Sequence, residues 1–118
     1  MVVDASYVAA MLFPDEMSPE SELASLKLLA PGLLHYELVN ALKMTVKRKR
    51  FEERKAIGLL QDFIALPITY SNPPYNQVLG VAIEFDISAY DAAYVVLAKE
   101  KKVPLLTLDK KLESLAGH

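Results

Sequence analysis

Four acidic side chains stand where the surrounding residues give no burial reason for an acid. Asp4 and Asp109 each end a short apolar run, and Glu37 and Asp91 each lie in the first turn of a predicted helix. Four carboxylates at close range repel one another unless cations neutralise them. Oxygen-only ligands suit Mg²⁺ or Mn²⁺, and such a metal can activate a water and stabilise the leaving oxygen of a phosphodiester. The four acids are therefore candidate catalytic and metal-binding residues.

Each acid also has a structural interpretation. Ser88 and Asp91 match a capping box, in which the acid returns a hydrogen bond to the capping residue. Glu37 could complement a helix dipole, and Asp109 could be the N-cap of a short helix over residues 110–115. Asp4 is the hardest to explain in this way, because it interrupts an otherwise apolar start. One shared site accounts for all four acids more simply than four separate coincidences.

The elements that must position these acids alternate along the chain. Short apolar runs predict strands at residues 1–3, 27–30, 66–70 and 103–108. Leu34, Leu38, Leu42 and Val46 recur every four residues, which predicts a helix over residues 35–49. Two more helices are predicted from periodic apolar residues, one from Ile57, Leu60 and Ile64 and one from Val78, Ala82 and Phe85. The apolar run over residues 92–98, capped by Ser88, predicts another helix. Ser18–Pro19 has the form of an N-cap followed by proline, which predicts a helix start there.

Strands that alternate with helices imply parallel pairing through crossover connections. The sequence therefore predicts a three-layer α/β/α sandwich with a short parallel sheet, formed by one domain over residues 1–118. Ligands bind at the carboxyl ends of the strands in such a sheet, and the helices that follow begin at the same edge. We expect all four carboxylates to converge on one cleft.

The composition excludes several other classes. The 118 residues are 53% apolar, which excludes disorder, and the net charge of −2 excludes bulk polyanion binding. The chain has no cysteine, so disulfides and thiolate zinc sites are also excluded. No signal peptide or membrane span is visible, and we expect a cytoplasmic protein.

At four places the sequence resembles the PIN-domain family, and specifically the VapC-type toxin ribonucleases. The similar segments are residues 2–6 (VVDAS), 35–42 (HYELVNAL), 90–95 (YDAAYV) and 106–112 (LTLDKKL). Their acids are separated by 33 (4 to 37), 54 (37 to 91) and 18 residues (91 to 109). The resemblance assigns the conserved acids to Asp4, Glu37, Asp91 and Asp109, and gives Ser6, Asn40 and Thr107 supporting roles.

This resemblance implies an activity and two partners. The expected activity is an endoribonuclease that depends on Mg²⁺ or Mn²⁺ and has RNA as its substrate. The expected partners are further copies of the chain, in a homodimer or higher homo-oligomer, and a cognate VapB-type antitoxin, whose tail fills the acidic cleft.

A run of basic residues is the candidate RNA contact. Seven of the 13 basic residues fall between positions 43 and 55, and Lys43, Lys47, Arg48 and Arg50 are the expected RNA-binding residues. Phosphate contacts of this kind hold the backbone without reading sequence. The alternative is a solvated helix end whose cations complement the dipole.

Two other functions stay open at this stage. One is a phosphoacceptor signalling domain, which Thr107 and Lys110 would suit. That function needs an aspartate at the end of a central apolar strand, and residues 66–71 contain no acid. The other is an inactive PIN-like binding module, against which the intact set of four acids argues.

Overall fold

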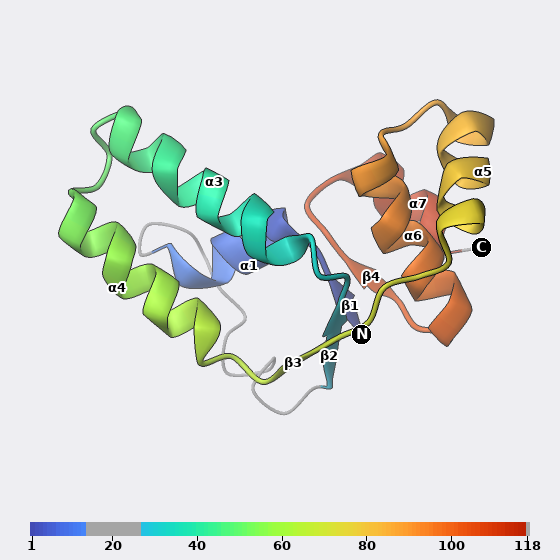
Figure 1. Ribbon diagram of the computed structural model, residues 1–118, viewed down its shortest axis with the longest axis horizontal. Helices are drawn as coiled ribbons and strands as arrows, with labels where there is room; N and C mark the ends of the chain where they lie inside the picture. The colour runs from blue at the N-terminus through green and yellow to red at the C-terminus, as the bar shows by residue number, and fades with distance from the viewer. Residues whose placement is uncertain (14–26, 118) are drawn as a thin grey trace.

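A four-stranded parallel sheet lies between two groups of helices in the computed structural model, which describes residues 1–13 and 27–117 (Figure 1). The strands are β1 (Val2–Val3), β2 (Leu28–Ala30), β3 (Ile68–Tyr70) and β4 (Leu105–Leu106), in the spatial order β3-β2-β1-β4. Val2 of β1 pairs with Leu29 on one side and Leu105 on the other. The strands are short and mostly apolar, as expected for a parallel sheet covered on both faces.

Helices cover the sheet on both sides. One group consists of α1 (Ala5–Leu12), α3 (Leu34–Lys47) and α4 (Glu53–Ile64), and the other of α5 (Tyr75–Phe85), α6 (Ala89–Lys101) and α7 (Lys110–Ala116) (Figure 1). In the first group, α1 packs against both α3 and α4, which form an antiparallel pair. These layers confirm the predicted three-layer α/β/α fold. Within residues 1–13 and 27–117, no helix has the length and apolarity needed to cross a membrane.

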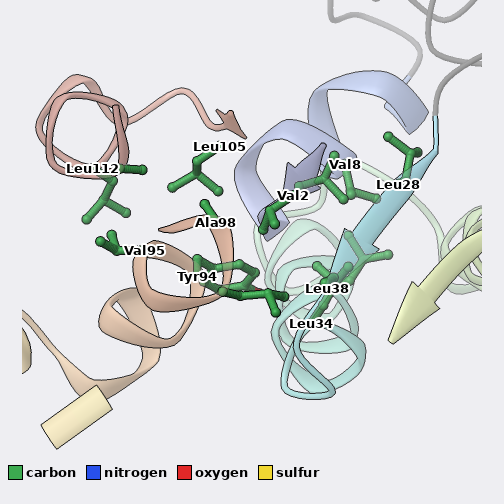
Figure 2. Close-up of a cluster of buried hydrophobic side chains, with 14 of the residues drawn as sticks. Val2, Val8, Leu28, Leu34, Leu38, Tyr94, Val95, Ala98, Leu105 and Leu112 are labelled. Carbon is green, nitrogen blue, oxygen red and sulfur yellow. The ribbon is translucent and has the colours of Figure 1, made fainter. Parts of the chain in front are cut away.

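Helix α6 is the central element of the core. All seven residues from 92 to 98 are buried, because α6 contacts β1 and β4 as well as α5 and α7. A helix that is apolar on every side is suited to such an enclosed position. Figure 2 shows side chains of α6 meeting those of α3 and the sheet, with Tyr94 close to Leu34 and Leu38. The core thus fixes α6 relative to α3, the two helices that carry Asp91 and Glu37.

The helices differ from the sequence-based expectation at four points. Helix α1 was not predicted, because its eight residues follow Asp4 directly and their apolar pattern is too short to show a period. Helix α4 is present, but it buries Ala56, Leu59 and Phe63 and leaves Ile57 and Ile64 exposed. Both sets have helical spacing, so the pattern alone could not select the buried face.

The other two corrections are smaller. Helix α3 ends at Lys47, two residues early, and Lys49 adopts a left-handed conformation with φ of 59°. Val46 is only half-buried at this end of the helix, although the apolar stripe predicted its burial. The helix start predicted at Ser18–Pro19 lies outside the described residues.

Candidate active site

Asp4 is held in place by three hydrogen bonds. It follows β1 directly and is the N-cap of α1, and its side chain is buried. Its Oδ1 accepts hydrogen bonds from the Ser6 hydroxyl at 2.7 Å and from the Tyr7 backbone N–H at 3.1 Å, while its Oδ2 accepts one from the Thr107 hydroxyl. The hydroxyls of Ser6 and Thr107 therefore hold the Asp4 carboxylate in one orientation.

The same hydroxyls connect Asp4 to the end of β4. The backbone N–H of Leu108 donates to Ser6 Oγ at 3.1 Å, and that of Asp109 donates to Thr107 Oγ1 at 3.0 Å. Asp109 in turn is the N-cap of α7, and its Oδ1 accepts from the backbone N–H groups of Lys111 and Leu112. This network holds two of the four acids at adjacent strand ends, since β1 pairs with β4.

Glu37 and Asp91 reach the site from α3 and α6. Each lies in the first turn of its helix, and each is half-buried. The Tyr94 hydroxyl donates a hydrogen bond to Glu37 Oε1. The backbone N–H of Asp91 donates to Ser88 Oγ at 3.0 Å, so Ser88 caps α6 as predicted. The helix cap therefore fixes the backbone at Asp91, one turn before Tyr94.

All four acids line a single pocket with a volume of about 360 Å³. The lining residues are Asp4, Ala5, Ser6, Glu37, Asp91, Tyr94, Leu108, Asp109 and Leu112. Elements far apart in the sequence thus bring the acids together at one edge of the sheet. Over the described ranges, no three His, Cys, Asp or Glu side chains are already arranged to ligate one metal ion. The acids share a pocket without forming a complete coordination shell.

The electrostatics of the pocket reflect this crowding. Burial raises the pKa of Glu37, and the charges of Asp91 and Asp4 raise it further, against the opposite effect of the Tyr94 hydrogen bond. Burial also raises the pKa of Asp91, together with the charges of Asp109 and Asp4, while the Ser88 hydrogen bond lowers it. A divalent cation would relieve this repulsion, and the carboxylate oxygens are the donors that Mg²⁺ and Mn²⁺ prefer. The donor chemistry therefore fits such a metal.

Tyr94 is the polar pocket residue to which the sequence assigned no role. Burial raises the pKa of its hydroxyl well above the ordinary value, and the hydrogen bond to Glu37 acts in the same direction, so it remains a protonated donor. One signal was available, because Tyr94 follows Asp91 by three residues and these two positions share a helix face. It passed unnoticed because an aromatic residue in an apolar helix is usually part of the core.

The remaining predicted residues lie away from the acids. Asn40 is exposed on α3 and does not line the acidic pocket. Lys43 and Lys47 border an apolar groove between α3 and α4, whose volume is about 510 Å³. Arg48 is exposed at the C-cap of α3, and the Arg50 guanidinium lies over the rings of Phe13 and Phe51. The basic residues therefore follow α3 away from the pocket.

Comparison with known proteins identifies the family. The model of the PIN domain matches residues 1–118. The chain belongs to the PIN domain family. "Ribonuclease VapC3" of Pyrobaculum aerophilum is 34% identical over 95% of this chain and 91% of its own length. "Exonuclease VapC9" of the same organism is 30% identical over 94% of this chain and 81% of its own length.

A solved structure agrees with the PIN domain assignment. The crystal structure of PAE2754 from Pyrobaculum aerophilum superimposes with a TM-score of 0.82 at 26% sequence identity. The match covers 97% of this chain and 82% of that one. The PIN-like fold expected from the sequence is thereby confirmed, and no feature of the described residues favours a phosphoacceptor domain.

Proposed function

We propose that this PIN domain is a metal-dependent endoribonuclease, acting as the toxin of a VapBC-type toxin–antitoxin pair. The observation that carries the proposal is the single pocket lined by Asp4, Glu37, Asp91 and Asp109, which four separate segments of the chain supply. Relatives named as VapC ribonucleases support RNA as the substrate and a VapB-type antitoxin as a partner. A toxin of this kind would act on RNA in the cytoplasm.

The four acids would hold Mg²⁺ or Mn²⁺ in this pocket. When bound, such a cation supplies an activated water and stabilises negative charge on the phosphodiester oxygens. Asp4 is oriented for this role by Ser6 and Thr107, and Glu37 by Tyr94. Leu112 is buried at the pocket and adds an apolar wall, which excludes water from one side of the carboxylates.

A homodimer is the proposed assembly. Tyr75, Leu79 and Ile83 follow one another at four-residue spacing on α5, and they are 82%, 60% and 72% exposed. A stripe of large apolar side chains in water is typical of an interaction surface. Met11 and Phe13, by contrast, are apolar residues buried in the core.

The basic residues of α3 would hold the RNA backbone. Lys47 lies ten residues after Glu37, a distance of about 15 Å along the helix axis. Replacing Lys47 and Arg48 with Gln should raise KM for RNA and leave Mn²⁺ affinity unchanged, because phosphate contacts contribute to affinity and not to chemistry. Steady-state cleavage at two salt concentrations measures this effect. An unchanged KM would remove these residues from the RNA contact.

The proposed activity is tested with circular RNA as the substrate. A circle has no end for an exonuclease, so its conversion to a linear product reports internal cleavage alone. We expect wild-type protein, free of antitoxin, to linearise the circle with Mn²⁺ and to stop when EDTA is added. The Asp4→Asn and Asp91→Asn variants should lose cleavage by about 100-fold or more while remaining folded.

A matched variant makes the loss interpretable. Asp62 is an exposed acid on α4 outside the pocket, so Asp62→Asn should cleave as the wild type does. Undiminished cleavage in EDTA would contradict the metal requirement. Cleavage of linear RNA but not of circles would indicate an exonuclease, as the name of one relative suggests for that protein. Failure to cleave any RNA with metal present would favour an inactive binding module.

A further inference from the structure

Tyr94 places a polar group on α6, the helix with the longest run of buried residues in the part of the chain that the structure describes. Its side chain is 1% exposed, and its neighbours from 92 to 98 are Ala, Val and Leu. The ring packs in the core beside Leu34 and Leu38, as Figure 2 shows. A phenylalanine would fill the same apolar volume without a hydroxyl that needs a partner. The hydroxyl is therefore the feature to explain.

That hydroxyl extends from the core to the acidic pocket. It donates to Glu37 Oε1, a bond that joins α6 to α3 across 57 residues of sequence. A glutamate side chain has several rotatable bonds, so a fixed donor on one oxygen removes much of its freedom. The bond takes up one of the two lone pairs of Oε1 and leaves both lone pairs of Oε2 for a cation.

We propose that Tyr94 is a positioning residue of the metal site, whose hydroxyl fixes the Glu37 carboxylate as a one-oxygen ligand beside Asp91. The inference rests on the proposed function, because it requires the four acids to hold a metal. Tyr94 and Asp91 share one face of α6, so the same helix supplies one ligand and orients another. The distance between the carboxylates of Glu37 and Asp91 is then set by the buried helix α6, and the flexibility of the Glu37 side chain has less effect on it.

The competing explanation is that Glu37 merely satisfies a buried hydroxyl. In that case, the loss of the hydroxyl alters the stability of the fold but not the affinity for metal. Partners that orient a metal ligand behave differently, since their removal typically weakens metal affinity by about 10–100-fold. Metal affinity therefore separates the two roles.

The experiment compares Tyr94→Phe with Tyr90→Phe by titration with Mn²⁺, in which electron paramagnetic resonance follows the free ion. Tyr90 lies one turn earlier on α6, is exposed, and does not line the acidic pocket. We expect the Tyr94→Phe variant to bind Mn²⁺ about 10–100-fold more weakly, and the Tyr90→Phe variant to bind it as the wild type does. Equal affinity in Tyr94→Phe and wild-type protein would overturn the inference.

A double variant shows whether Tyr94 acts through Glu37. In a Glu37→Gln background, Tyr94→Phe should cause no additional loss of Mn²⁺ affinity, because the carboxylate that it orients is already gone. If Tyr94→Phe lowered Mn²⁺ affinity by the same factor in the Glu37→Gln background as in the wild-type background, Tyr94 would act on the metal by another route. That result would contradict the proposal.

A second measurement applies even if Tyr94→Phe does not fold. A crystal structure of the wild-type protein with Mn²⁺ should show Glu37 ligating the ion through Oε2 while Oε1 accepts from Tyr94. A Glu37 that ligates through both oxygens, or that has left Tyr94, would overturn the inference. Wild-type protein that binds no Mn²⁺ and cleaves no RNA would instead reject the proposed function itself.

Discussion

At the scale of single residues, the structural and functional interpretations of the acids hold together. Asp4 caps α1 and Asp109 caps α7. Ser88 caps α6, and Asp91 lies in the first turn of that helix. A helix N-terminus carries a partial positive charge, so it tolerates a carboxylate well. Because the helices begin where the parallel strands end, capping itself brings the acids to one edge. Local stability and a shared site are therefore served by the same side chains.

The crowding of these acids predicts a dependence of stability on pH. The pKa of Asp91 is raised from its ordinary value of 3.8 by burial and by the charges of Asp109 and Asp4. The folded chain therefore binds more protons than the unfolded chain as pH rises past this value, and the free energy of unfolding falls. In EDTA, Asp91→Asn should thus unfold at a higher temperature than wild-type protein at pH 7, and this advantage should vanish near pH 3.

Thermal unfolding followed by circular dichroism from pH 3 to pH 8 measures this effect. Asp62→Asn is the control, because Asp62 is exposed and lies outside the pocket. An Asp91→Asn variant with the same midpoint as wild-type protein at pH 7 would show that the carboxylate is not destabilised by its neighbours. If the unfolding temperature of Asp91→Asn exceeded that of the wild type by more at low pH than at pH 7, a raised pKa of Asp91 could not be the cause, because its carboxyl group is uncharged at low pH.

At the scale of elements, the sequence was informative wherever a period ran long enough. The stripe of Leu34, Leu38 and Leu42 located α3 and its buried face, and the apolar run over residues 92–98 with its cap Ser88 located α6. The face of α4 was wrong because both of its candidate stripes are apolar, and only contact with α1 and α3 selects between them. Spacing places Tyr94 on the same helix face as Asp91, but it does not reveal the contact with Glu37, which lies on another helix.

The packing between α3 and α6 predicts a large effect for one substitution. Leu38 is fully buried between the sheet and α6, one residue after Glu37. Leu38→Ala should lower the free energy of unfolding by about 2–5 kcal/mol, because it removes buried methyl groups and leaves a cavity. Urea unfolding at equilibrium measures the change.

The neighbouring residue provides the control for this substitution. Val39 is exposed on the same helix, so Val39→Ala should change the free energy of unfolding by no more than about 0.5 kcal/mol. Similar losses in the two variants would mean that α3 is not anchored through the face that carries Leu38.

At the scale of the whole molecule, the charge and the apolar surface are both unevenly distributed. The chain has 15 acids and 13 bases, and setting aside the four pocket acids leaves 11 acids against the same 13 bases. The negative excess is thus concentrated in one pocket, and the rest of the chain is mildly basic. The exposed apolar stripe of Tyr75, Leu79 and Ile83 lies on α5, in the other helical group from the basic end of α3 (Figure 1).

The stripe on α5 predicts the oligomeric state. Wild-type protein should have about twice the mass of its 13.1 kDa chain in solution, and Leu79→Glu should convert it to a monomer by burying an unpaired charge at the interface. Light scattering coupled to size-exclusion chromatography measures the mass. Ile64→Glu is the matched control, since Ile64 is also a largely exposed apolar residue and lies on α4. A monomeric wild type, or a dimeric Leu79→Glu variant, would exclude this surface as the dimer interface.

The central claim is that the four acids bind the metal that hydrolyses RNA, and the Mn²⁺ dependence of the cleavage rate tests it most directly. The rate of circle linearisation should rise with Mn²⁺ concentration and reach half its maximum where half of the protein has bound the ion. In Asp91→Asn, the same concentrations should give neither binding nor cleavage. A cleavage rate that reaches its maximum before the protein has bound Mn²⁺ would contradict the claim. So would cleavage by Asp91→Asn at the wild-type rate.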